Sequence, residues 1–86
     1  MAKRFAYFYL LRREPERIQL FVPQHVAYWH GLHLNAYMGG PFVDSSGGLV
    51  TFEARTLETA KEYVDRDPLV LLDLLEDSWL REWSLE

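Results

Sequence analysis

The sequence predicts an α+β fold, a ferredoxin-like plait with the element order β-α-β-β-α-β and a four-stranded antiparallel sheet. Three observations support this prediction. An aromatic, strand-like segment opens the chain, two segments with helical periodicity flank a Gly-rich hairpin, and an alternating segment closes the chain. With right-handed crossovers, both helices lie on one face of the sheet. We expect the same face of a second copy to cover the other side, in a two-fold homodimer formed through the sheets.

The first strand is expected over residues 4–11, where aromatic and β-prone residues run without Gly or Pro. Because successive side chains point to opposite faces of a sheet, this segment divides into two apolar sets. One face carries Phe5, Tyr7, Tyr9 and Leu11, and the other carries Ala6, Phe8 and Leu10. A strand that is apolar on both faces is typical of an interior position that is covered on each side.

The first helix is expected over residues 23–37, because Pro23 suits the first turn of a helix. Its inward stripe is expected to consist of Val22, Val26, Trp29, His33 and Ala36, widened by Tyr28 and Leu32. The Gly-Gly-Pro sequence at residues 39–41 ends this helix. A short edge strand at 41–43, a hairpin turn at 44–48 and a return strand at 49–54 are expected to follow.

The second helix is expected over residues 57–66, with Thr56 as its N-cap. Asp67 ends this helix, because a residue that precedes proline is pushed out of the helical conformation. The apolar residues 69–75 are expected to form either a short helical turn or a docked segment. The last strand, over residues 78–85, is expected at an edge of the sheet with tryptophans on its apolar face.

Composition limits the classes of protein that the chain can belong to. Its 86 residues predict one domain over 1–86, and hydrophobic and charged fractions of 49% and 26% are those of a globular protein. The absence of cysteine from the sequence excludes disulfide scaffolds and Cys-ligated zinc folds, and favours a cytoplasmic location. The net charge of −4 argues against nucleic-acid binding and against attraction to anionic membranes. No apolar run is long enough to cross a bilayer.

His25 is the first candidate for chemistry. It lies two residues after Pro23, at the positive end of the expected helix, where a neutral imidazole is favoured and can act as a general base. The alternative is a structural histidine without a role. Asp67 is the second candidate, because a carboxylate at the negative end of a helix needs a partner such as an imidazole N–H. Asp44 is a weaker candidate, since Asp is common in turns.

Metal and phosphate sites are not expected. His30 and His33 lie one turn apart on the expected helix, but no Cys accompanies them and no Asp or Glu occurs between Arg17 and Asp44. The glycine pairs lack the Gly-Lys-Ser/Thr ending of a phosphate-binding loop. We therefore expect no metal and no cofactor.

The order of these segments resembles the YCII-related domain family over about residues 4–83. The shared features are the strand at 5–11, Pro23-Gln24-His25-Val26, Gly40-Pro41, Asp44, the strand at 48–54, the helix at 57–64 and Asp67-Pro68. The resemblance implies the dimeric α+β barrel fold. It also implies an activity, because a few members act as dehydrochlorinases on chlorinated aromatics, and muconolactone isomerases share the architecture. The family's proposed histidine–aspartate pair would correspond to His25 and Asp67.

Family members often carry an arginine shortly before the histidine, where this chain has Val22. Arg12 and Arg13 are the candidates to replace it. This difference bears on whether the site accepts an anionic substrate, and it leaves the fold inference intact.

Two functional hypotheses follow. In the first, the protein is a cofactor-independent lyase or isomerase that acts on a small cyclic or aromatic-derived compound. His25 takes a proton, Asp67 fixes its tautomer, and Asp44 is a reserve partner. The apolar pocket is expected to be lined by Tyr7, Tyr9, Trp29 and Phe42. In the second, the same cleft belongs to a non-catalytic module for small-ligand binding or regulation. A purely structural subunit is a third alternative.

Overall fold

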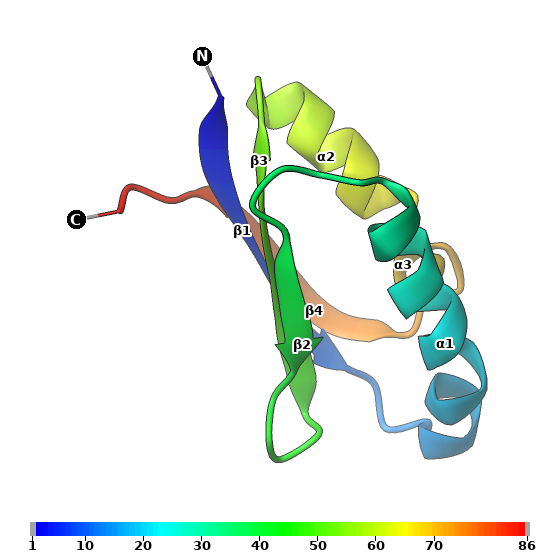
Figure 1. The fold of residues 1–86 in the computed structure, drawn as a ribbon. Helices are drawn as coiled ribbons and strands as arrows, with labels where there is room; N and C mark the ends of the chain where they lie inside the picture. Colours follow the sequence, from blue (N-terminus) through cyan, green and yellow to red (C-terminus); the bar gives the residue numbers. More distant parts are fainter. Residues whose placement is uncertain (1, 86) are drawn as a thin grey trace.

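The computed structural model describes residues 2–85 and has the predicted α+β fold (Figure 1). The four strands form one antiparallel sheet with the order β2-β3-β1-β4, and the helices lie together on one side of it. The bounds of the elements are β1 Lys3–Leu11, α1 Pro15–Gly31, β2 Met38–Pro41, β3 Gly47–Ala54, α2 Leu57–Asp65, α3 Pro68–Leu71 and β4 Leu75–Glu82.

Strand β1 occupies the interior position that its two apolar faces predict. It pairs with β3 on one side and with β4 on the other, so that Tyr7 lies opposite both Val50 and Leu80. The face that carries Phe5, Tyr7 and Tyr9 is turned toward the helices, and all three side chains are buried. The core that forms between sheet and helices also contains Trp29, Val50, Phe52, Ala54, Ala60, Val64, Leu69 and Leu74.

Helix α1 begins eight residues earlier than predicted, because Pro15 and not Pro23 occupies its first turn. Pro23 lies inside the helix, where it cannot donate a hydrogen bond to the carbonyl of Gln19. The inward stripe shifts accordingly: His25 and Trp29 are buried, whereas Val26 is 42% exposed. The predicted stripe was therefore wrong for Val26, His33 and Ala36, and it was confirmed for Trp29, Tyr28 and Leu32, which pack in or against the core. His25 takes an interior position.

The segment after α1 also differs from the prediction. The helix ends at Gly31, and His33 and Ala36 adopt left-handed backbone angles, with φ of 51° and 54°, in the loop that follows. Strand β2 then uses Met38–Pro41 in place of residues 41–43. Gly47 begins β3 at a close approach of two backbones, because a Cβ there would lie 1.9 Å from the backbone oxygen of Tyr9.

The second half of the chain follows the prediction more closely. Thr56 caps α2, since its Oγ1 accepts a hydrogen bond from the Thr59 N–H at 3.1 Å. The segment after Asp67 forms a short helical turn, α3, which is one of the two predicted alternatives. Strand β4 is an edge strand as predicted, but it covers Leu75–Glu82 and so begins three residues before the expected position.

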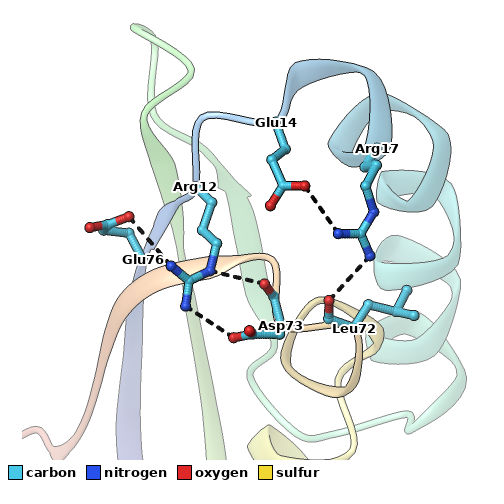
Figure 2. Close-up of polar contacts among 6 residues, drawn as sticks. All are labelled: Arg12, Glu14, Arg17, Leu72, Asp73 and Glu76. Atoms are coloured by element: carbon cyan, nitrogen blue, oxygen red, sulfur yellow. Dashed lines mark hydrogen bonds and ion pairs between the residues drawn. The ribbon is translucent and has the colours of Figure 1, made fainter.

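Two arginines join the end of β1, the start of α1 and the turn between α3 and β4 (Figure 2). Arg12 donates to the backbone oxygen and the carboxylate of Asp73, at 3.0 and 3.1 Å, and lies 3.8 Å from Glu76. Arg17 donates to Glu14 at 3.1 Å and to the carbonyl of Leu72 at 3.4 Å. Exposed pairs of this kind contribute little stability, but they hold the Arg12 guanidinium at this turn.

The side of the sheet opposite the helices is open within the described residues, as Figure 1 shows. We call it the open face; it carries the second set of β1 side chains and their neighbours on the other strands. Among residues 2–85, no helix combines the length and the apolar character that crossing a membrane requires.

Candidate functional site

Asp67 owes its position to the proline that follows it. The residue before proline is excluded from the helical region, and Asp67 is extended with φ −60° and ψ 129°. Its Oδ1 accepts a hydrogen bond from the Leu69 N–H at 2.9 Å, so Asp67 is the N-cap of α3. The sequence placed this carboxylate at the unfavourable end of a helix. It lies at the favourable start of the next helical turn instead.

The Asp67 carboxylate is fully buried and accepts hydrogen bonds from three parts of the chain. Besides the Leu69 N–H, Nε1 of Trp29 donates to Oδ2 at 2.9 Å, and Nδ1 of His25 lies 2.9 and 2.8 Å from the two oxygens. A buried carboxylate is tolerated when its oxygens are paired in this way. Asp67 therefore fastens two side chains of α1 to the start of α3.

These contacts assign the tautomer of His25. Because a carboxylate only accepts hydrogen bonds, Nδ1 must carry the hydrogen, and in the neutral ring Nε2 then has a free lone pair. The side chain is 8% exposed, and Nε2 lies 3.3 Å from the hydroxyl of Tyr9. His25 sits in the middle of α1, so the helix-end argument made from the sequence does not apply. Asp67, and not the helix dipole, orients its ring.

A cavity of about 500 Å³ lies beside this pair, between α1, the β2–β3 hairpin and the end of β1. Its volume is in the range of small-molecule sites. Most of the surface of its wall is apolar, and the polar side chains include two histidines and two tyrosines. The lining residues are Tyr9, Leu11, Ile18, Gln19, Val22, Pro23, His25, Val26, His30, Tyr37, Gly39, Gly40, Pro41, Ser45, Gly47, Val50 and Leu69. Within the described part of the chain, no acidic or arginine or lysine side chain lines it.

The structure brings some of the predicted site residues together and separates others. His25 and Asp67 are in contact, and Tyr9 lines the cavity with His25. Tyr7 and Trp29 are fully buried behind the wall, where Trp29 contacts Asp67 and packs on Tyr7 with ring centroids 5.8 Å apart. Neither residue lines the cavity as expected, because both rings are enclosed by the core, where they support the residues of the wall.

Phe42 and Asp44 lie elsewhere. Phe42 packs against Phe8 with ring centroids 5.1 Å apart, and both residues line a hollow of the open face together with Asp44. Asp44 accepts hydrogen bonds from the hydroxyl and the backbone N–H of Ser46, and these bonds lower its pKa. The expectations for both residues are corrected here, because they follow the end of β2 and line this other hollow, not the cavity beside His25.

Sequence reasoning missed several residues of the cavity wall. His30 had been considered only as a metal ligand, yet it lines the cavity and packs edge-on against Tyr37, with ring centroids 5.6 Å apart. His30 lies in the last turn of α1 and Tyr37 in the loop after it, whereas the predicted helix over 23–37 contained both residues. Arg12, one of the two expected substitutes for the missing arginine, is paired with Asp73 and Glu76. No group of three or more His, Cys, Asp or Glu residues within 2–85 is arranged to hold a metal ion.

Burial raises the pKa of both tyrosines nearest to the pair. For Tyr9, burial and then the charge of Asp67 raise the pKa to about 12. The pKa of Tyr7 is raised further, by burial first and by Asp67 second. The hydroxyl of Tyr7 has no hydrogen-bond partner among the described residues. Tyr9 is consequently a neutral hydroxyl at any ordinary pH, able to donate as well as to accept a hydrogen bond.

The fold and the site together define a small α+β plait domain with a buried His–Asp pair beside an apolar cavity. The family model for the YCII-related domain matches residues 6–84, and the chain belongs to this family. This assignment confirms the resemblance found in the sequence.

Several solved structures are similar to the chain, including the following two. One is 5-chloro-2-hydroxyhydroquinone dehydrochlorinase from Burkholderia phenoliruptrix AC1100, in complex with 2,5-dihydroxybenzoquinone; its TM-score is 0.80 at 20% identity, over 94% of this chain and 93% of that one. The other is Rv0793 from Mycobacterium tuberculosis, with a TM-score of 0.66 at 11% identity, over 100% of this chain and 96% of that one. At these identities the likeness establishes the fold. No functionally curated protein sequence matches the chain significantly.

Replacing Asp67 by Ala should destabilise the protein by about 3 kcal/mol, because it leaves the Nδ1–H of His25 and the indole N–H of Trp29 buried without an acceptor. Urea unfolding measures the loss. Asp44→Ala is the matched control: this carboxylate is exposed and bonded only within its turn, so its loss should matter far less. Equal effects of the two substitutions would contradict the central role of Asp67.

The stability of the protein should fall as the pH rises from about 10 to about 12. The pKa of Tyr9 is about 12 in the folded chain and about 10 in the unfolded chain, so the unfolded state loses its proton first and is favoured over this interval. Denaturation midpoints at several pH values measure the slope. Tyr9→Phe should reduce the slope, and Tyr63→Phe on α2 serves as the control. A wild-type midpoint that stays constant over this range would refute the prediction.

Proposed function

We propose that the protein is a lyase or isomerase that needs no cofactor for its proton transfer and acts on a small cyclic or aromatic-derived compound. His25 is the general base and Asp67 its orienting partner. One observation carries the proposal: the buried Asp67 holds Nδ1 of His25 at 2.8 Å, so Nε2 is the basic nitrogen of a side chain that lines the cavity. A histidine that is fixed in this tautomer can take a proton at Nε2 as a general base.

The proton transfer balances with these two residues alone. A C–H or O–H bond of the substrate breaks, its proton goes to Nε2 of His25, and its electron pair remains on the substrate. In a lyase, this pair forms a new double bond as a leaving group such as chloride departs with the electrons of its own bond. In an isomerase, the imidazolium returns the proton to another atom. Asp67 stabilises the imidazolium between these steps through the Nδ1–H bond.

The cavity supports the substrate class. Its apolar wall suits a ring, and the hydroxyls of Tyr9 and Tyr37 together with His30 can bind substituents that carry oxygen. The absence of acidic, arginine and lysine side chains from the described wall favours a substrate without a strong fixed charge. The dehydrochlorinase with the same fold was solved with 2,5-dihydroxybenzoquinone, a six-membered ring that carries oxygen substituents.

Turnover should depend on His25. Chloride release from a chlorinated hydroxyhydroquinone, and deuterium uptake from D2O by 2,5-dihydroxybenzoquinone measured by NMR, both report proton abstraction. We expect His25→Asn to slow these reactions by about 10²–10⁴-fold, the range of a general base. Asp67→Asn should slow them by about 10²-fold or more, because it removes the charge that supports the imidazolium.

The matched control is His33→Asn, since His33 is exposed in the loop after α1 and should leave both rates unchanged. Turnover that survives His25→Asn would overturn the proposed role of this residue. Tight binding of the ring by the wild type without chloride release or deuterium uptake would favour the non-catalytic ligand-binding module instead.

We also propose that the protein works as a homodimer formed through its open face. Phe8, Trp79 and Trp83 gather there and remain 37%, 37% and 43% exposed, and Phe8 lies 5.1 Å from Trp79 between ring centroids. Exposed aromatic clusters of this kind are normally covered. The face also carries both signs of charge, because the Arg4–Glu53 pair at 3.7 Å lies beside it, so two copies related by a two-fold axis can match.

Trp79→Glu should convert the dimer into a monomer, because it places a charge in the centre of the proposed interface. Light scattering after size exclusion should show twice the chain mass of 10.2 kDa for the wild type and the single mass for the variant. Leu71→Glu is the control, since Leu71 is 69% exposed on α3, on the helix side. A monomeric wild type at working concentration would refute the dimer.

A further inference from the structure

Tyr9 occupies a position that the proposed roles of His25 and Asp67 leave unexplained. It comes from the central strand β1, is 5% exposed, and lines the cavity. Its hydroxyl lies 3.3 Å from Nε2 of His25, the nitrogen that would receive a proton from a substrate. Any substrate that reaches Nε2 must therefore also meet this hydroxyl.

The neighbouring strand makes room for the phenol. Gly48 lies opposite Tyr9 in the β1–β3 register, and a Cβ at Gly48 would come within 2.3 Å of the Tyr9 hydroxyl and 2.6 Å of the ring carbon that bears it. Only glycine permits this placement without a shift. The ring is further held by Tyr7, at 5.3 Å between centroids, and by the edge-on imidazole of His25, at 5.4 Å. The hydroxyl is thus positioned by packing before any ligand binds.

The hydroxyl is a neutral donor with a weak present partner. Because burial and the charge of Asp67 raise its pKa to about 12, the phenol keeps its hydrogen at working pH. Its contact with Nε2, at 3.3 Å, is longer than the 2.5–3.0 Å typical of hydroxyl donors. Such a bond is easily exchanged for a shorter bond to a charged oxygen, which is roughly twice as strong.

We propose that Tyr9 is a further catalytic residue, whose O–H donates a hydrogen bond to the oxyanion that forms on the substrate as His25 takes its proton. The inference rests on the proposed function. A substrate O–H or C–H bond breaks, the proton goes to Nε2, and the electron pair resides on the substrate oxygen as a phenolate or enolate. Protonated Nε2 no longer accepts from Tyr9, so the Tyr9 hydroxyl turns to the new anion. The proton of Tyr9 itself is not transferred.

A phenol whose ionisation changes its colour tests this arrangement, and 4-nitrophenol is the probe. Bound to the wild type near neutral pH, the probe should show the visible band of its phenolate more strongly than it does free in the same buffer. In Tyr9→Phe the ratio of bound phenolate to bound phenol should fall at least about tenfold, the value of a hydrogen bond to a charged group. Tyr63→Phe is the matched control, because Tyr63 on α2 lies outside the cavity wall.

Gly48→Ala provides a second variant that keeps the hydroxyl but must displace it, so it should lower the ratio in the same direction. The outcomes distinguish the proposed role of His25 as the base from the proposed role of Tyr9 as the hydrogen-bond donor. A probe that stays neutral in the wild type, or whose ionisation is unaffected by His25→Asn, overturns the base and with it the role of Tyr9. A phenolate band that depends on His25 and is unchanged in both Tyr9→Phe and Gly48→Ala overturns the role of Tyr9 alone.

Discussion

The organisation of the site depends on one buried carboxylate. Asp67 is fully buried, and such a group is tolerated only because an imidazole, an indole and a backbone N–H all donate to it. These donors come from two helices, so satisfying the charge fixes the position of α1 against α3. The same bonds fix the tautomer of His25. The position of α1 against α3 and the tautomer of His25 therefore depend on the same hydrogen bonds.

The side chains of the central strand β1 contribute to two surfaces, one on each face of the sheet. Because its side chains alternate, Tyr7 and Tyr9 face the helices while Phe8 faces the open side. The first surface supports the cavity, and the second carries the aromatic cluster that we propose as the dimer interface. A chain of 86 residues has little material for a separate core and interface. One strand with two apolar faces provides for both.

The sequence was most informative where a local rule acts alone. Thr56 was recognised as a cap and Asp67-Pro68 as the end of a helix, because each depends on neighbouring residues only. Residues 4–11 were recognised as an interior strand because both of their faces are apolar. The start of α1 was misjudged, since Pro15 and Pro23 both suit a first helical turn. Burial of Ile18 and Phe21 against the core favours the earlier start and offsets the hydrogen bond that Pro23 cannot make.

What the sequence determined by itself was the order of the elements and the identity of the two residues, His25 and Asp67, that could share a proton. Only the tertiary structure decided that these two side chains are in contact and that Nε2 of His25 carries no hydrogen. It also decided that the Tyr9 hydroxyl lies beside Nε2, in the space that Gly48 leaves. The physical reason is sequence distance. His25 and Asp67 are 42 positions apart, and the conformational preferences of neighbouring residues cannot specify a contact over that distance. The packing of α1 and α3 on the sheet brings the two together, and their burial then gives the pair its chemistry.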